Sequence, residues 1–138
     1  MKLIINLLIM LSTQLILAGE IRDKEVINET IKIYIEGQRT DNQELIKKVF
    51  HSDANLKFIS IRDNEYKIIS IERYLTFFSN KKEREFEENI FYIDIVGTAA
   101  NVKLSLKYET FQYTHYMNML KTGEGWKIVN KITCQENF

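Results

Sequence analysis

Residues 100–109 read ANVKLSLKYE, and this stretch decides the fold class that the sequence predicts. Its apolar and aromatic side chains are Ala100, Val102, Leu104, Leu106 and Tyr108, and they alternate with Asn101, Lys103, Ser105, Lys107 and Glu109. Successive side chains of a β-strand point to opposite faces of the sheet. Alternation with a period of two therefore predicts a strand with one buried and one polar face.

Similar stretches lie on both sides of this strand. Residues 91–95 alternate before it, with Phe91, Ile93 and Ile95 on one face, and Gly97-Thr98 turns the chain. Residues 111–120 and 126–134 follow, separated by a turn at residues 122–125. Short turns between long strands predict antiparallel neighbours. Residues 56–61 and 66–69 predict two shorter strands joined by a turn at 62–65.

Three segments have helical spacing. The first covers residues 23–36, with Asp23 as its cap and Gly37 as its left-handed end. The second starts at Thr40-Asp41 and is followed by a polar loop at residues 51–55. The third begins after Ser70, and its apolar stripe is Ile71, Tyr74, Leu75 and Phe78. Helices on one side of an antiparallel sheet define an α+β fold. We expect a cone, in which N-terminal helices pack on a strongly curved, mainly antiparallel sheet around a central pocket.

Length and composition narrow the class of protein. The 138 residues fit one domain, and 19 basic residues balance 19 acidic ones. A chain without net charge has no overall field to attract nucleic acid, so a nucleic-acid partner is not expected. Cys134 is the single cysteine, which excludes an internal disulfide and metal sites built from paired cysteines. An isolated cysteine in apolar surroundings is usually a small buried side chain.

The first 19 residues have the pattern of a secretory signal peptide. Lys2 precedes an apolar run, and the small residues Ala18 and Gly19 precede a charged segment. A membrane anchor or a core helix is the alternative, but the run is short and interrupted by polar residues. Glu20 stands where a lipoprotein would need cysteine. We therefore expect cleavage near Ala18 or Gly19, a domain over residues 20–138 without a membrane span, and a secreted or periplasmic location.

Several segments resemble the putative lumazine-binding family of the nuclear-transport-factor-2-like superfamily. They are residues 34–37 (YIEG), 50–54 (FHSDA), 93–100 (IDIVGTAA) and 120–132 (LKTGEGWKIVNKI). The resemblance covers nearly all of the expected mature chain and implies the cone-shaped fold. The superfamily includes isomerases, dehydratases and polyketide cyclases, together with binding and assembly domains without catalysis. Family members commonly carry an aspartate where this chain has His115.

Strand alternation predicts which polar side chains point into the cone. Phe111, Tyr113, His115, Met117 and Met119 share one face, and Trp126, Ile128, Asn130, Ile132 and Cys134 share another. His115 and Asn130 are the polar exceptions on these faces, and buried polar groups need partners. Tyr34 and His51 are placed to reach the same opening. The candidate ligand-binding residues are thus Tyr34, His51, His115, Asn130 and Trp126. The alternative is a structural role, in which the polar groups satisfy one another and Trp126 belongs to the core.

Three functions remain open from the sequence. The first is an exported, non-catalytic domain that binds a small hydrophobic or heteroaromatic ligand or a protein partner. The second is an isomerase or dehydratase of the ketosteroid-isomerase or polyketide-cyclase kind, which needs a base in an apolar pocket. Asp94 shares the face of Tyr92 and is expected to point away from the core. The third is a homodimer through the sheet face that carries Tyr92 and Tyr116. Two histidines without a third ligand predict no metal site, and no motif predicts a cofactor.

Overall fold

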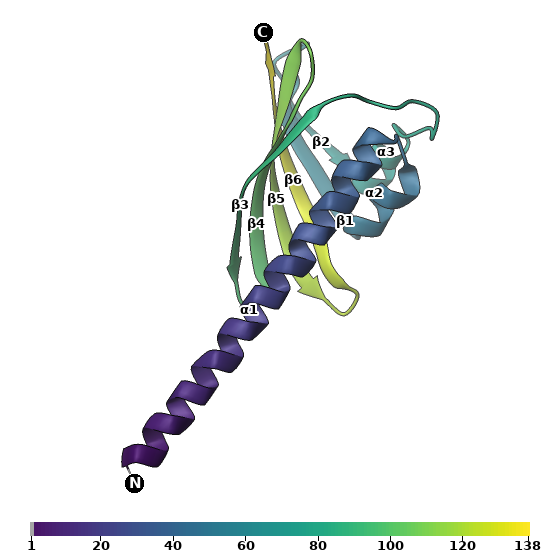
Figure 1. Ribbon diagram of the computed structural model, residues 1–138. Coiled ribbons are helices and arrows are strands. Elements are labelled where there is room, and N and C mark those ends of the chain that lie inside the picture. Colours follow the sequence, from purple (N-terminus) through teal and green to yellow (C-terminus); the bar gives the residue numbers. More distant parts are fainter. Residues whose placement is uncertain (1) are drawn as a thin grey trace.

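The structure is a computed structural model that describes residues 2–138, without the side chains of residues 2–8, 11 and 12. Over this range the helices and strands are α1 (Lys2–Arg39), α2 (Gln43–Val49), β1 (Phe50–Ile59), β2 (Tyr66–Ser70), α3 (Ile71–Leu75), β3 (Glu87–Val96), β4 (Ala99–Lys107), β5 (Phe111–Thr122) and β6 (Gly125–Asn137). The strands form one curved sheet in the order β2-β1-β6-β5-β4-β3. The helices lie against one side of it (Figure 1). The predicted α+β fold is confirmed.

Strand pairing is antiparallel except at one place. β6 pairs antiparallel with β5 on one side and parallel with β1 on the other. β6 is therefore central to the sheet although it is the last strand in the chain. Strands β1 and β2 lie on one side of β6, and β5, β4 and β3 lie on the other.

Helix α1 is much longer than the segment that the helical spacing predicts. It runs without interruption from Lys2, and its N-terminal part extends away from the sheet (Figure 1). Leu15 and Ile16 are each 70% exposed there. Asp23 is consequently inside the helix, and its predicted role as the N-cap is wrong. In the described residues no helix combines the length and the apolar composition that crossing a membrane requires.

The end of α1 differs from the prediction at Gly37. Gly37 is helical, and the residue in the left-handed conformation is Asp41, with φ at 53°. Gly37 instead allows α1 and α2 to approach closely, because a Cβ there would lie 2.8 Å from Ile46 Cδ1. The N-cap of α2 is Asn42, whose side chain accepts a hydrogen bond from the Leu45 backbone. Ser70 caps α3 as predicted, accepting from the Arg73 backbone.

Residues 51–55 are part of strand β1, so the predicted loop there is wrong. Their short polar side chains suggested a loop, but Ala54 and Leu56 are buried and fix one face of the strand. The pairing of β1 with β6 shifts register between Phe50 and Asn55. The exposed polar residues occupy this irregular part of the strand.

Two bulges change which side chains point inward. In β6, Ile128 pairs with Met119 and Asn130 pairs with Asn118, which leaves Val129 as an extra residue. An extra residue reverses the faces that follow it. Lys131 is accordingly buried, whereas Ile132 is 46% exposed. Cys134 is exposed as well, which contradicts the expected burial of the thiol.

A second bulge lies in β3, where the register shifts between Ile90 and Tyr92. Phe91 is the extra residue, and its ring is 51% exposed. Ile93 and Ile95 remain packed against the core. The predicted inward face is therefore correct for Ile93 and Ile95 and wrong for Phe91.

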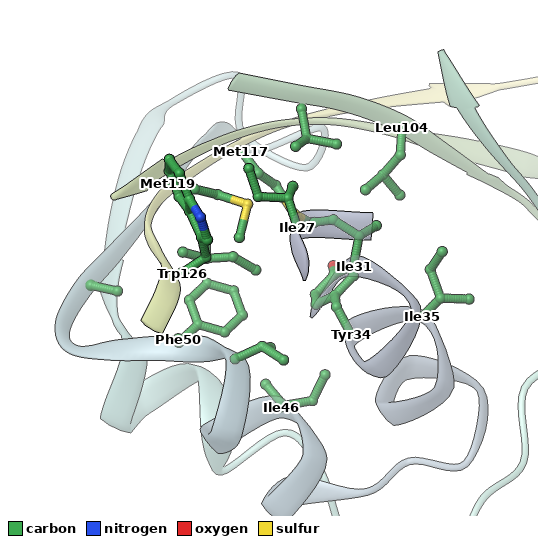
Figure 2. Close-up of a cluster of buried hydrophobic side chains, with 14 of the residues drawn as sticks. Ile27, Ile31, Tyr34, Ile35, Ile46, Phe50, Leu104, Met117, Met119 and Trp126 are labelled. Atoms are coloured by element: carbon green, nitrogen blue, oxygen red, sulfur yellow. The ribbon is translucent and has the colours of Figure 1, made fainter. Parts of the chain in front are cut away.

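The core fills the space between α1, α2 and the concave face of the sheet (Figure 2). Ile27, Ile31 and Tyr34 of α1 are fully buried, as is Ile46 of α2. They pack against Leu104, Met117, Met119, Trp126 and Ile128 from the long strands. The buried face predicted for residues 100–106 is confirmed, since Val102, Leu104 and Leu106 have no exposed surface, but Ser105 of the predicted polar face is buried as well, with 5% exposure.

We expect Gly37→Ala to lower the free energy of unfolding by about 1 kcal/mol. Alanine favours a helix by about 1 kcal/mol over glycine, but overpacking typically costs about 1–3 kcal/mol. The new Cβ would lie 2.8 Å from Ile46 Cδ1. The loss should be smaller in an Ile46→Val background, which removes that methyl group, with Ile46→Val alone as the control. Urea unfolding of the unaltered protein, the two single variants and the double variant measures the coupling energy between residues 37 and 46. Equal losses in both backgrounds would show that the contact does not limit packing.

Candidate ligand-binding cavity

One end of the sheet forms a cavity of about 1440 Å³ that is open to solvent on one side. Its walls are β1 and the turn into β2, helix α3, residues 82–85, and the inward faces of β5 and β6. Polar and charged side chains at its inner end are Gln38, His115, Lys131 and Thr133. The cavity is large enough for a molecule of several fused rings, since ligand sites commonly measure about 300–1,000 Å³.

Aromatic rings form much of the cavity wall. Tyr108 and Phe111 stack with centroids 4.5 Å apart, and Tyr113 meets Phe111 edge-on at 5.2 Å. On the opposite side Tyr74 contacts Phe77 and Phe78, with centroids 6.2 and 5.1 Å away. Such rings offer flat apolar contacts to a planar ligand.

Lys131 lies at the inner end of the cavity and is only 3% exposed. Its Nζ donates hydrogen bonds to the hydroxyl oxygens of Tyr34 at 3.0 Å and Tyr74 at 2.9 Å. It also lies 4.3 Å from the centre of the Tyr74 ring. Burial lowers the pKa of the Lys131 ammonium, and the bond to Tyr74 opposes this effect. The same burial raises the pKa of Tyr34 well above its usual value.

His115 lies beside this lysine on the neighbouring strand. Its Nδ1 is 3.0 Å from Thr133 Oγ1, and its ring stacks on Tyr113 with centroids 5.8 Å apart. Burial, and then the charge of Lys131, holds the pKa of His115 well below its ordinary value. The imidazole is therefore neutral at pH 7 and acts as a hydrogen-bonding group, not as a cation.

A chain of polar contacts connects the cavity to the helices. Gln38 Nε2 donates to the Tyr74 hydroxyl at 2.6 Å, and Arg84 reaches Gln38 Oε1 at 3.4 Å and Asp41 Oδ1 at 2.5 Å. Burial acts to raise the pKa of Asp41, but hydrogen bonds from Ser79 and the charge of Arg84 outweigh it and lower the pKa. The segment that forms this wall is thus fixed to the end of α1 by an ion pair that is nearly buried.

The structure brings together two of the five predicted residues. Tyr34 and His115 are neighbours, with ring centroids 6.0 Å apart, and His115 lines the cavity. Trp126 is in the core at the other end of β6, where its Nε1 donates to Asp23 at 3.1 Å. Lys121 also binds Asp23, at 2.8 Å. These two donors lower the pKa of the Asp23 carboxyl.

His51 and Asn130 do not lie at the opening, so the predicted grouping is wrong for both. His51 Nδ1 is 2.5 Å from Asp53 on the partly exposed part of β1, outside the cavity lining. Asn130 is on the outer face because the bulge at Val129 reverses the strand before it. Its amide joins Asn118 at 3.2 Å and Asn55 at 2.8 Å.

Lys131, Tyr74 and Gln38 are the cavity residues that the sequence analysis missed as site residues. Tyr74 was placed in a buried stripe, but nothing in the spacing indicated a role for its hydroxyl. Unbroken alternation from Trp126 and Ile128 puts Asn130 on the inward face and therefore does not select Lys131. No feature of residues 126–134 marks the bulge, which is visible only in the pairing with β5. Among the described residues no group of three side chains is arranged to hold a metal ion.

Comparison with protein families now defines the relationship. The model of a family described as putative lumazine-binding matches residues 22–132, which include the core and all of the cavity lining except Thr133 and Gln135. The chain belongs to this family. The family resemblance stated from the sequence segments is therefore confirmed. No curated protein sequence matches significantly.

Solved structures with the same fold are similar to this chain. A nuclear-transport-factor-2-like protein of unknown function from Shewanella baltica OS155 is 26% identical, with a TM-score of 0.77 over 86% of this chain and 97% of that one. A similar protein from Methylobacillus flagellatus KT is 22% identical, with a TM-score of 0.73 over 83% and 93% of the two chains. The CaMKII hub of S. rosetta is 12% identical, with a TM-score of 0.63 over 81% and 95%. Two of these structures belong to proteins of unknown function, so the comparison supports the fold, and a fold alone does not define an activity.

Proposed function

We propose that this protein is an exported, non-catalytic domain that binds a small molecule with an apolar or heteroaromatic body. The observation that carries the proposal is the cavity of about 1440 Å³, whose aromatic walls surround a few polar groups at the inner end. A concave site of this composition is typical of small-molecule binding. The family description, putative lumazine-binding, agrees with a planar heteroaromatic ligand.

An isomerase or dehydratase is the second candidate, because His115 lines the cavity. Burial lowers the pKa of this imidazole and makes it a weak base. The acidic residues that line the cavity are Asp63, Glu83 and Glu85, and all three are exposed. A carboxylate buried in apolar surroundings, which the ketosteroid type of reaction uses, is therefore missing from the described lining. Binding without chemistry has the better support.

Binding should depend on the cavity and not on the outer face of the sheet. Gln135 lines the cavity, whereas its neighbour Glu136 is exposed outside it. We expect lumazine to perturb the NMR signals of Tyr113, His115 and Thr133. Gln135→Trp should weaken this binding at least about tenfold by filling the opening, since a tenfold loss corresponds to about 1.4 kcal/mol. Glu136→Trp should leave it unchanged. Equal effects of the two variants, or shifts confined to the outer face, would contradict the proposal.

Export is supported by the N-terminal part of α1. Its apolar side chains, including Leu15, Ile16 and Leu17, are exposed. Further along α1, the side chain of Asp23 accepts a hydrogen bond from Lys121 of β5. Cleavage near Ala18 or Gly19 would remove the exposed apolar surface and keep this contact. Expression of the full chain in a Gram-negative host should yield a periplasmic product that begins at Gly19 or Glu20, as measured by intact mass. A full-length cytoplasmic product would contradict export.

The outer face of the sheet supports the proposed homodimer. Tyr92 is 43% exposed and Tyr116 is 38% exposed on this face. A row of side-chain amides crosses the same face from β4 to β1, and each amide hydrogen-bonds to the next. The row consists of Asn101, Asn118, Asn130 and Asn55. Large aromatic side chains with satisfied polar groups are typical of interfaces between subunits.

Sedimentation at high protein concentration tests this interface. We expect a dimer for the unaltered protein and a monomer for Tyr116→Glu, because a buried unpaired carboxylate opposes association. Tyr66→Glu is the matched control, since Tyr66 is 59% exposed on the edge strand β2. A monomeric unaltered protein, or a dimer that survives Tyr116→Glu, would exclude this surface.

A further inference from the structure

The charge of Lys131 has no acidic partner in the described part of the chain. Its recorded hydrogen bonds go to two uncharged hydroxyl groups, those of Tyr34 and Tyr74, and it forms none of the ion pairs. A buried ion without a counter-ion is costly, because it loses its hydration and gains no opposite charge. The burial of Lys131 without a counter-ion therefore does not contribute to the stability of the fold and needs another explanation.

Burial lowers the pKa of Lys131, but its nearest neighbours stabilise the ammonium form against this effect. Both hydroxyl groups accept hydrogen bonds from Nζ, and the faces of the Tyr34 and Tyr74 rings lie 5.2 and 4.3 Å from it. Ring faces attract cations. An ammonium group has three N–H donors, and these two bonds use two of them. Lys131 lines the cavity, so one donor and one unbalanced charge remain for a ligand.

The other charges that line the cavity are nearly balanced once their partners are included. Its basic lining residues are Arg62, Lys67, Arg73, Lys82, Arg84 and Lys131, against the acidic Asp63, Glu83 and Glu85. Arg84 pairs with Asp41, and Lys67 pairs with Asp63 and Glu65, so Lys131 is the buried cation of the lining that has no acidic partner among the described residues.

From these observations, and resting on the proposed function, we propose that the ligand is an aromatic organic anion. Its negative group, a carboxylate or another oxyanion, binds Lys131 at the inner end of the cavity. Its ring system contacts the aromatic wall that includes Tyr113 and Phe77. The anion supplies the missing counter-charge, and the ammonium supplies a charge-assisted hydrogen bond in a site sheltered from water.

A matched pair of probes tests the charge requirement. 2-Naphthoate and 2-naphthamide have the same rings and nearly the same shape, but only the first is an anion at pH 7. Calorimetric titration of the full chain should show that naphthoate binds about tenfold or more tightly than naphthamide, as expected for a hydrogen bond to a charged group. The preference should weaken in high salt much less than a surface contact would, because the pair is buried.

Two lysine variants assign the preference to Lys131. Lys131→Met keeps the length of the side chain and removes the charge, and it should abolish the preference for naphthoate. Removing a buried charge is compatible with folding, which a thermal melt of the variant checks. Lys57→Met is the control, since Lys57 lies on β1 outside the cavity lining. It should retain the preference.

The outcomes separate this inference from the proposed function. Equal affinity of the unaltered protein for both probes would overturn the anion proposal while leaving a binding cavity. A preference that persists in Lys131→Met would overturn the role of Lys131. Binding of neither probe at millimolar concentration would count against both proposals. The comparison of probes on the unaltered protein decides the matter even when the methionine variant does not fold.

Discussion

The bulge at Val129 is the constraint on which the interior of this protein depends. Before it, β6 directs Trp126 and Ile128 into the core beneath α1. After it, the same strand directs Lys131 and Thr133 into the cavity. A strand without the extra residue would place Lys131 on the outer face and Asn130 inside. One extra residue thus lets a single strand serve an apolar core at one end and a polar site at the other.

A network of polar contacts connects the helices to the walls of the cavity. Tyr34 of α1 and Tyr74 of α3 meet through Lys131, and Gln38 connects Tyr74 to Arg84. The nearly buried pair of Arg84 and Asp41 joins the end of α1 to the segment before β3. Buried polar groups need partners with good geometry, and a fully satisfied network makes its surroundings rigid. The same network therefore gives the cavity its shape and its chemistry.

Much of the fold could be predicted because its causes are local. The alternation of residues 100–106 produces a strand with one buried face, and the spacing of Ile27, Ile31 and Tyr34 produces a helix that packs on it. The candidate site was predicted less well, since its residues come from six separate helices and strands and the loops between them. Tyr34 and His115 were found because each lies on an unbroken apolar stripe. Asn130 was misplaced because a bulge is set by the partner strand, and His51 because short polar residues there form an irregular strand.

The sequence by itself determined the class of the fold, the family and the order of the elements, because hydrophobic periodicity depends on neighbours along the chain. Three features follow from tertiary contacts alone. They are the side of β6 that faces inward, the hydrogen bond from Trp126 to Asp23, and the burial of Lys131 between two tyrosines. Register and bulges follow from pairing between distant strands. Residues 34, 74 and 131 become a site only when the sheet curves around the helix and brings them within hydrogen-bond distance.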